Sequence, residues 1–283
     1  MKIKLHLGAH KTATTHIQLI LENNRDILLD NKIRLLTPKD LRPNFITILK
    51  NISNSNLLKD VDILIISEEN IAGVPYDLKI SSGIYSNVKE KLNIIKYIFP
   101  NDDIEIFFSI RSYDEFYRSS YLEVVRNRGY IPFKDFYNQD RFINNSWLSV
   151  IKSFIEVVSE ENITIWCYED FKELTPLIIS QLTDNISQVD KILLSYKDIR
   201  TRPSLSSRTI NILNSFYSSN NKEEGNKIIE YLNNKYPISS NNPPYIPFNN
   251  KNRIRLQERY IGDINFIDKK YYNVNFLKVG NGR

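Results

Sequence analysis

Short apolar runs alternate with longer amphipathic segments over the first two-thirds of the chain. The runs predict β-strands, because strands covered on both faces of a parallel sheet read as continuous apolar segments. In the segments around them, apolar residues recur at helical spacing. We therefore expect strands at 2–7, 61–66, 104–110 and 163–166, and helices at 12–24, 84–99, 113–127, 145–159 and 173–182.

This alternation is typical of βαβ units, in which each crossover helix covers a face of a parallel sheet. The predicted fold class is α/β, a three-layer α/β/α sandwich with a central, mainly parallel sheet. We interpret residues 1–283 as a single domain with a core of about 1–200. Beyond the core the strand signal fades and no new sheet begins, so 201–283 is expected to be a helical carboxy-terminal extension. Its predicted helices are 205–218, 222–234 and 251–260, with a loop rich in Asn, Ser and Pro at about 237–250.

Composition narrows the class of protein. The 283 residues carry 38 Lys and Arg against 33 Asp and Glu, a net charge of +5, and 41% are hydrophobic. This hydrophobic content excludes a disordered or collagen-like chain. The mild charge excess is not the basic stripe of a nucleic-acid-binding protein, so no nucleic-acid partner is expected. The single cysteine, Cys167, excludes an internal disulfide framework and a cysteine-based zinc cluster.

Localisation is predicted from the apolar stretches. None approaches the length of a membrane-spanning helix, so no integral membrane segment is expected. The alternation of Ile3, Leu5 and Leu7 breaks at Gly8 instead of continuing as the apolar core of a signal peptide. We therefore expect a cytoplasmic protein.

The first candidate site is the loop between the first strand and the first helix. A glycine at the strand end lets the backbone bend sharply and lets an anion approach. The unpaired N–H groups of the helix start attract phosphate or sulfate, threonine hydroxyls add donors and a lysine adds positive charge. The alternative is a solvated lysine beside a threonine N-cap. The candidate anion-binding residues are Gly8, Ala9, His10, Lys11, Thr12, Ala13, Thr14 and Thr15.

The spacing in this loop differs from that of a Walker A motif, in which four residues separate the first glycine from a Gly-Lys pair. Here two residues separate Gly8 from Lys11, and no glycine precedes the lysine. The stretch instead resembles the 5′-phosphosulfate-binding loop of sulfotransferases that use 3′-phosphoadenosine 5′-phosphosulfate (PAPS), which usually reads Gly-x-x-Lys-Thr-Gly-Thr-Thr. Ala13 stands where glycine is common, and we expect it to be tolerated because alanine adopts a helical conformation well.

A second element, after the strand at 104–110, resembles that family's 3′-phosphate motif. In the motif, an arginine at a strand end is followed eight residues later by a serine and, two further on, by a tyrosine. Arg111, Ser119 and Tyr121 fit these positions. Ligands of open α/β sheets bind at the carboxyl ends of the strands, where Arg111 is expected. The alternative is an arginine paired with Asp114 or Glu115.

The resemblance implies a P-loop-NTPase-like sulfotransferase that transfers a sulfuryl group from PAPS to an acceptor hydroxyl and releases adenosine 3′,5′-bisphosphate, with no metal required. Lys11 would neutralise the oxygen that bridges phosphorus and sulfur. By analogy with bacterial members, the acceptor would be a carbohydrate or surface glycan.

The acceptor hydroxyl needs a general base. The sequence after the second strand, Ser67 to Asn70, resembles a Ser-Ser-Glu-Asn stretch of bacterial members and aligns the family's glutamate with Glu69. Because adjacent strand residues point to opposite faces, we expect one glutamate of the pair to face the site, and we favour Glu69. Glu68 and His10 are the alternatives for the base, and a pair of glutamates capping a following helix is the structural alternative.

Other functions remain open at this point. The three histidines, His6, His10 and His16, fit no familiar metal-binding spacing, so no metal site is expected. A small P-loop kinase would place Lys11 and Thr12 on the phosphates of ATP, with Glu68 or Glu69 near Mg²⁺. A non-catalytic module would bind nucleotides or anionic polymers without turnover.

Overall fold

In a computed structural model, which describes residues 1–80, 83–137, 145–194, 204–219 and 221–280, the chain folds around one six-stranded sheet. Every neighbouring pair of strands is parallel, in the order β2-β3-β1-β4-β5-β6. The predicted α/β class is therefore confirmed. The strands are β1 (Lys2–His6), β2 (Ile33–Leu36), β3 (Ile63–Ser67), β4 (Asp103–Ile110), β5 (Ile163–Cys167) and β6 (Asn275–Leu277).

The four strands predicted from apolar runs are present, each within two residues of its expected ends. β2 and β6 were not predicted, because four and three residues are too few to show a periodic pattern. No new sheet begins in the extension, but it is not helical at β6, which pairs with β5 through Phe276 opposite Ile165. The last part of the described chain thus returns to the edge of the same sheet.

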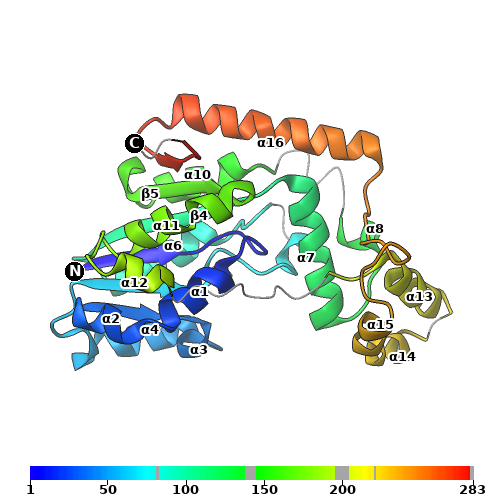
Figure 1. Ribbon diagram of the computed structural model, residues 1–283, viewed down its shortest axis with the longest axis horizontal. Coiled ribbons are helices and arrows are strands. Elements are labelled where there is room, and N and C mark those ends of the chain that lie inside the picture. Colours follow the sequence, from blue (N-terminus) through cyan, green and yellow to red (C-terminus); the bar gives the residue numbers. More distant parts are fainter. Residues whose placement is uncertain (81–82, 138–144, 195–203, 220, 281–283) are drawn as a thin grey trace.

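Helices cover both faces of the sheet, as Figure 1 shows. Two clusters of buried apolar side chains separate the layers. The helices on one face are α1 (Thr14–Glu22), α2 (Arg25–Asp30), α11 (Phe171–Leu182) and α12 (Val189–Leu194). Those on the other are α4 (Phe45–Ser53), α6 (Val88–Ile98), α10 (Trp147–Ile155) and α16 (Asn250–Lys270).

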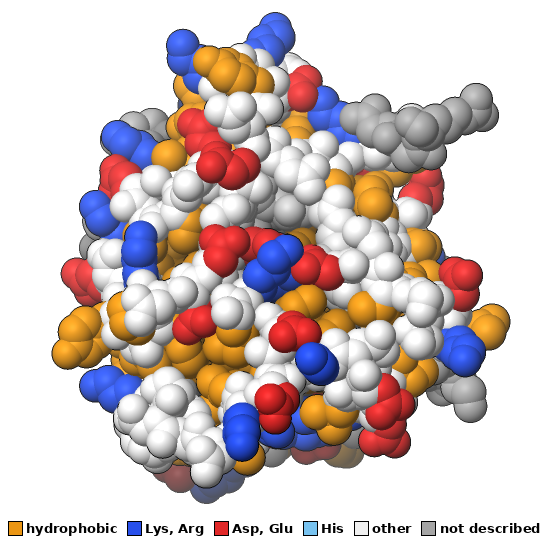
Figure 2. All heavy atoms as spheres, turned by 90° about the vertical axis from the view of Figure 1, so that its left-hand side faces the viewer, with side chains coloured by type: hydrophobic (Ala, Val, Ile, Leu, Met, Phe, Trp, Pro, Cys, Tyr) orange, Lys and Arg blue, Asp and Glu red, His pale blue; other side chains and the backbone are white. Residues whose placement is uncertain are grey.

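The central strand β1 shows how the sequence alternates between these layers. Ile3 and Leu5 belong to the cluster under α6 and α10, whereas Lys4 lies on the opposite face beside the ring of Phe107. The amino ends of the strands lie toward the side shown in Figure 2, where basic and acidic side chains are interleaved. The carboxyl ends of all the strands meet at the opposite edge.

The remaining helices lie largely beyond that carboxyl edge. In Figure 1, α7 (Tyr113–Arg128) stands at the end of the sheet, and α8 (Phe133–Phe136), α13 (Ser207–Ser218), α14 (Lys222–Lys227) and α15 (Ile229–Lys235) pack beyond it. The predicted helix at 222–234 is thus two helices, and the one predicted at 251–260 extends over Asn250–Lys270 as α16. None of the helices in the described ranges is long and apolar enough to cross a membrane.

Short helical segments complete the chain. These are α3 (Pro38–Leu41), η1 (Asn56–Leu58), η2 (Glu69–Ile71), α5 (Asp77–Ile80), η3 (Glu160–Asn162) and η4 (Tyr168–Asp170). Three of the chain's turns meet at the carboxyl edge: the loop after β1, η2 after β3, and the start of α7 after β4. The candidate residues are gathered there because the strands are parallel and adjacent.

Candidate functional site

The loop after β1 continues the pairing with β4 and then turns sharply at Gly8. The N–H groups of Leu7 and Ala9 donate to Phe107 and Ser109 at 3.0 Å each. Gly8 has a φ of 48°, and a Cβ there would lie 2.3 Å from Cγ2 of Thr14. Both the conformation and the contact require glycine at this position.

Two further loop residues adopt the left-handed conformation. Lys11 has a φ of 66° and Ala13, which precedes α1, has a φ of 62°. The expectation that Ala13 is tolerated because it is helical is therefore wrong: the residue is left-handed, and its Cβ costs about 1–2 kcal/mol in that conformation. A glycine at this position would adopt it without strain.

The start of α1 presents donors to the space in front of the loop. Ala13 is the N-cap residue and has no side chain that can accept a hydrogen bond, so the N–H groups of Thr14 and Thr15 have no cap, whereas that of His16 donates to the Ala13 carbonyl at 2.9 Å. Of the threonines, Thr12 is buried and donates its hydroxyl to the carbonyl of Ala9, so it braces the loop. Thr14 is also buried, and Thr15 is exposed. The N–H groups of Ala9 and His10 are already used within the structure, so the donors that the loop could offer to an anion are Lys11 and the N–H groups at the start of α1.

Arg111 lies against this loop. Its Nη1 donates to the carbonyl oxygen of Lys11 at 2.7 Å, and its Nη2 lies 3.2 Å from the carboxylate of Glu115. The guanidinium also lies over the ring of Tyr168, 4.4 Å from the centroid. The alternative pairing with Glu115 therefore occurs, and it occurs together with a contact to the loop after β1, whereas Asp114 contacts Arg253 instead.

Helix α7 supplies the acidic partner of Lys11. The ammonium of Lys11 lies 3.1 Å from the carboxylate of Glu123. Burial alone would raise the pKa of Glu123, but the charge of Lys11 and its hydrogen bond outweigh burial and lower that pKa. Ser119 lies one helical turn before Glu123 and one after Glu115, so these three residues share the face of α7 that meets the loop.

Ser119 and Tyr121, which follow Arg111 in the 3′-phosphate motif, lie on different sides of α7. The Ser119 hydroxyl donates to the backbone carbonyl of Glu115 at 2.7 Å. Tyr121 is fully buried and donates to the carbonyl of Ile131 at 2.8 Å. Tyr121, which fits the last position of the motif, points away from the loop, because residues two apart on a helix point in different directions.

The two glutamates after β3 share one arginine. Glu68, 1% exposed, binds Arg42 through both oxygens at 2.8 and 2.9 Å and also accepts from the N–H of Asn70. Glu69, 17% exposed, lies 3.1 Å from Arg42. The expectation that the pair points to opposite faces is wrong because β3 ends at Ser67 and the chain turns into η2. Glu68 is committed to holding this turn, so Glu69 is the more accessible carboxylate.

The surroundings of Glu69 favour its ionised form. Its second oxygen lies 3.3 Å from the amide of Gln18 on α1. Burial alone would raise the pKa of Glu69, but the charge that His10 carries when protonated, the backbone N–H of Glu69 and the charge of Arg42 outweigh burial and hold the pKa below its ordinary value. The carboxylate can therefore accept a proton at neutral pH, although its basicity is reduced.

His10 is buried and held on both ring nitrogens. Nδ1 lies 2.8 Å from the hydroxyl of Tyr85, which also accepts from the backbone N–H of His10, and Nε2 lies 3.2 Å from Oδ1 of Asn70. Burial lowers the pKa of His10, so the ring is neutral. Because Oδ1 only accepts, we assign the hydrogen to Nε2, and Tyr85 donates to Nδ1. Both nitrogens are engaged, so His10 is less suited than Glu69 to act as the base.

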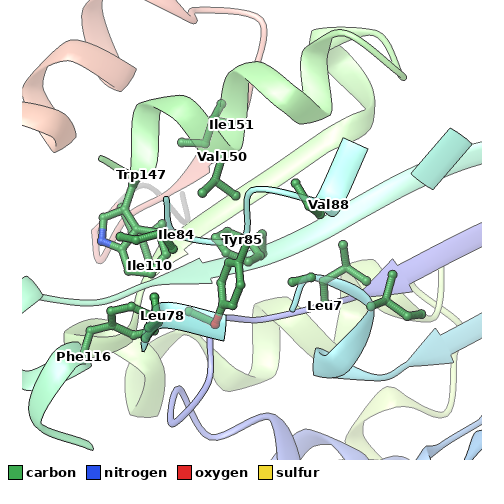
Figure 3. Close-up of a cluster of buried hydrophobic side chains, with 14 of the residues drawn as sticks. Leu7, Leu78, Ile84, Tyr85, Val88, Ile110, Phe116, Trp147, Val150 and Ile151 are labelled. Atoms are coloured by element: carbon green, nitrogen blue, oxygen red, sulfur yellow. The ribbon is translucent and has the colours of Figure 1, made fainter. Parts of the chain in front are cut away.

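Tyr85 anchors this arrangement from the core. Figure 3 shows its ring among buried apolar side chains that include Leu78, Ile84 and Val88, with its hydroxyl oxygen directed out of the cluster toward the loop after β1. No local sequence signal marks Tyr85 as a partner of His10, since the two lie 75 residues apart. Glu123, by contrast, could have been found from its helical spacing of four residues from Ser119.

Comparisons with protein-family models, curated proteins and solved structures found no match to this chain. The functional argument therefore rests on the residues and their geometry. Among the described residues, no group of three or more His, Cys, Asp and Glu is arranged to hold a metal ion. The carboxyl edge instead combines a cation-bearing loop, an arginine and one accessible carboxylate.

Proposed function

We propose that this protein is a PAPS-dependent sulfotransferase that transfers a sulfuryl group to a hydroxyl of a carbohydrate acceptor. The observation that carries the proposal is the contact between Arg111 and the backbone of Lys11, at 2.7 Å. It supports the proposal because one donor molecule carries both a 5′-phosphosulfate and a 3′-phosphate, which need neighbouring cationic positions.

The chain's own groups divide the work of this reaction. The loop N–H groups and Lys11 would bind the phosphosulfate, with Lys11 leaving Glu123 to neutralise the oxygen that bridges phosphorus and sulfur. Arg111, with Ser119 beside it, would bind the 3′-phosphate. Sulfuryl transfer, like phosphoryl transfer, depends mainly on positioning and charge stabilisation. No metal is required for these roles.

Glu69 would accept the proton of the acceptor hydroxyl. At the same time the hydroxyl oxygen would form a bond to sulfur, and the bond between sulfur and the bridging oxygen of the nucleotide would break. The argument for Glu69 is its exposure at the end of β3, next to the loop, and its ionised state. The ion pair with Arg42 lowers the basicity of Glu69. If the bound acceptor broke this pair and left Arg42 on Glu68 alone, Glu69 would accept the proton more readily.

The test compares adenosine 3′,5′-bisphosphate with ADP and ATP in thermal melts. A ligand at 100 times its dissociation constant stabilises the folded protein by about 2.7 kcal/mol. We expect the 3′,5′-bisphosphate to stabilise the protein most, without Mg²⁺. Selective stabilisation by ATP with Mg²⁺ would indicate the kinase instead. Binding of the bisphosphate without turnover of PAPS on any acceptor would indicate a non-catalytic module. A cytoplasmic location remains a prediction.

A further inference from the structure

A cavity of about 320 Å³ lies on the α6 side of the candidate site. It is formed where the chain leaves η2, turns through α5 and enters α6. Ligand pockets span roughly 300–1,000 Å³, so this cavity suits one ring and not an extended polycyclic molecule. The residues that line it are Ala72, Gly73, Asp77, Ile80, Tyr85, Ser86, Asn87 and Lys91.

The charges in the lining balance. Asp77 contributes one carboxylate and Lys91 one ammonium. Burial is the leading influence on Lys91 and lowers its pKa, while the charges of Asp77 and Glu68 act in the opposite direction. An anionic ligand would face Asp77 and a cationic one would face Lys91, so the pair favours a neutral ligand.

The polar groups call for a ligand that both donates and accepts hydrogen bonds. A carboxylate only accepts, an ammonium only donates, and the Ser86 hydroxyl and the Asn87 amide do both. Several hydroxyl groups on one ring meet all of these needs, because each hydroxyl can donate and accept. The ring of Tyr85 and the side chain of Ile80 add an apolar wall against which C–H groups can pack.

Two lining residues connect the cavity to the reacting edge. Tyr85 lines the cavity with its body and contacts His10 with its hydroxyl. Lys91 donates to the backbone carbonyl of Asn70 at 2.9 Å, and the side chain of Asn70 contacts the other nitrogen of His10. Asn70 is adjacent to Glu69 in the chain, so a ligand in the cavity would lie next to the residues that hold His10 and close to Glu69.

We propose that this cavity binds one neutral sugar ring of the acceptor, with Asp77 and Lys91 as its principal hydrogen-bonding partners. The role as an acceptor subsite rests on the proposed sulfotransferase function, whereas sugar binding itself can be measured without turnover. Gly73 lies against the Tyr85 ring, where a Cβ would be 2.5 Å away and would displace the ring from this lining.

The experiment measures binding of methyl glycosides of glucose, galactose, mannose and N-acetylglucosamine by saturation-transfer NMR. The matching methyl glucuronide and p-nitrophenol serve as anionic and aryl probes. We expect at least one neutral glycoside to bind and to shift the imidazole resonances of His10. Lys91→Met should weaken that binding about tenfold or more, the loss expected for a hydrogen bond to a charged group. Asp77→Asn should weaken it as well.

The matched control is Lys89→Met, on the same helix but outside the cavity, where Lys89 pairs with Glu156 on the surface. It should leave glycoside binding unchanged. Lys91 also donates to the backbone of Asn70, so its substitution could act on the structure as well as on the ligand. Asn87→Ala is therefore a second probe: it removes an amide that lines the cavity and that makes no capping hydrogen bond to α6. It should weaken binding while leaving the melting temperature unchanged.

The proposal is overturned if none of the four neutral glycosides binds, if the glucuronide or p-nitrophenol binds more tightly than all of them, or if Lys91→Met behaves like Lys89→Met. Adenosine 3′,5′-bisphosphate binding is measured in parallel on the same samples. If the protein binds the bisphosphate but no glycoside, the sugar site alone is rejected. If it binds a glycoside but not the bisphosphate, the sulfotransferase proposal is rejected.

Discussion

Two lysines seven residues apart, one inside β1 and one in the loop after it, have opposite surroundings. Lys4, on the strand, is 1% exposed, and its ammonium contacts the carbonyl of Gln181 and the carboxylates of Asp184 and Glu105. Lys11, in the loop after the strand, is 33% exposed and has one carboxylate partner, Glu123. A buried ammonium whose hydrogen bonds are all made within the protein stabilises the structure. An exposed ammonium with one carboxylate partner can exchange that partner for a ligand. The comparison separates a charge that is used within the structure from one that the proposed function assigns to a ligand.

The largest expected effect is on turnover at the functional end. Lys11→Met should lower turnover with PAPS by about 10²–10³, the loss typical of a donor removed from a charge-stabilising site. Its melting temperature should stay close to that of the wild type, because a half-exposed ion pair contributes little to stability. Steady-state kinetics and a melt on the same preparation check both parts. Turnover within about threefold of the wild type would remove Lys11 from the mechanism.

Arg42 tests whether the number of partners or the position decides the role of a cation, because it lies at the carboxyl edge of the sheet but binds both Glu68 and Glu69 through Nε and Nη2. Arg42→Met should destabilise the protein by roughly 2–3 kcal/mol, since buried Glu68 loses its charged partner. Urea unfolding measures this change. A loss as small as that of an exposed ion pair would show that Glu68 finds another partner.

The same variant makes a prediction about pH. In the folded protein the pKa of Glu69 lies below its ordinary value of 4.5, so ionised Glu69 stabilises the fold above that pH and the contribution is lost as the pH falls through the folded pKa. Without Arg42 the pKa should rise, which moves the acid limb of kcat/KM to higher pH. An unchanged acid limb would argue against Glu69 as the base.

Lys4→Met is the structural counterpart. We expect a loss of about 1–3 kcal/mol in unfolding free energy, because the carbonyl of Gln181 loses its charged donor. Binding of adenosine 3′,5′-bisphosphate should be unchanged. A variant that kept its stability but lost nucleotide binding would reverse the assignment of the two lysines.

A smaller effect is expected at Ala13. Ala13→Gly should stabilise the protein by up to about 1 kcal/mol, because glycine adopts the left-handed conformation without strain, although its greater freedom in the unfolded chain offsets part of the gain. Urea unfolding measures the change, and Gly8→Ala is the opposed control, which should destabilise. If Ala13→Gly lowered stability by more than about 1 kcal/mol, unfolded-state freedom would outweigh the strain.

The smallest effect concerns Glu123. Glu123→Gln removes the charge that competes with an anion for Lys11, so the affinity for adenosine 3′,5′-bisphosphate should rise a few-fold at most, given about 0.2–1 kcal/mol for such a pair. Calorimetric titration measures the change, with Glu90→Gln as a surface control on α6. Weaker binding in the variant would mean that Glu123 positions Lys11 for the ligand instead of competing with it.

The fold could be predicted from the sequence where buried strands were long enough to show an apolar run. The two short strands that form only because they pair with a longer neighbour were missed. β2 has four residues with Arg34 among them, and β6 has three, so only the neighbouring strands β3 and β5 define them. At the site, Gly8 and Arg111 follow strand ends, which periodicity can locate. Tyr85, the partner of His10, comes from the segment before α6, and Glu123, the partner of Lys11, comes from α7. Only the tertiary arrangement brings these residues together.

Trp147 gives this molecule an optical reporter for its own site. It is one of two tryptophans in the chain, its indole N–H donates to the carbonyl of Arg111 at 2.8 Å, and its ring stacks on Tyr113. Indole emission responds to changes in its hydrogen bond and neighbouring dipoles. A shift of the strand end that carries Arg111 would therefore change the fluorescence, so a movement that a ligand caused there would be visible in real time without attaching a dye.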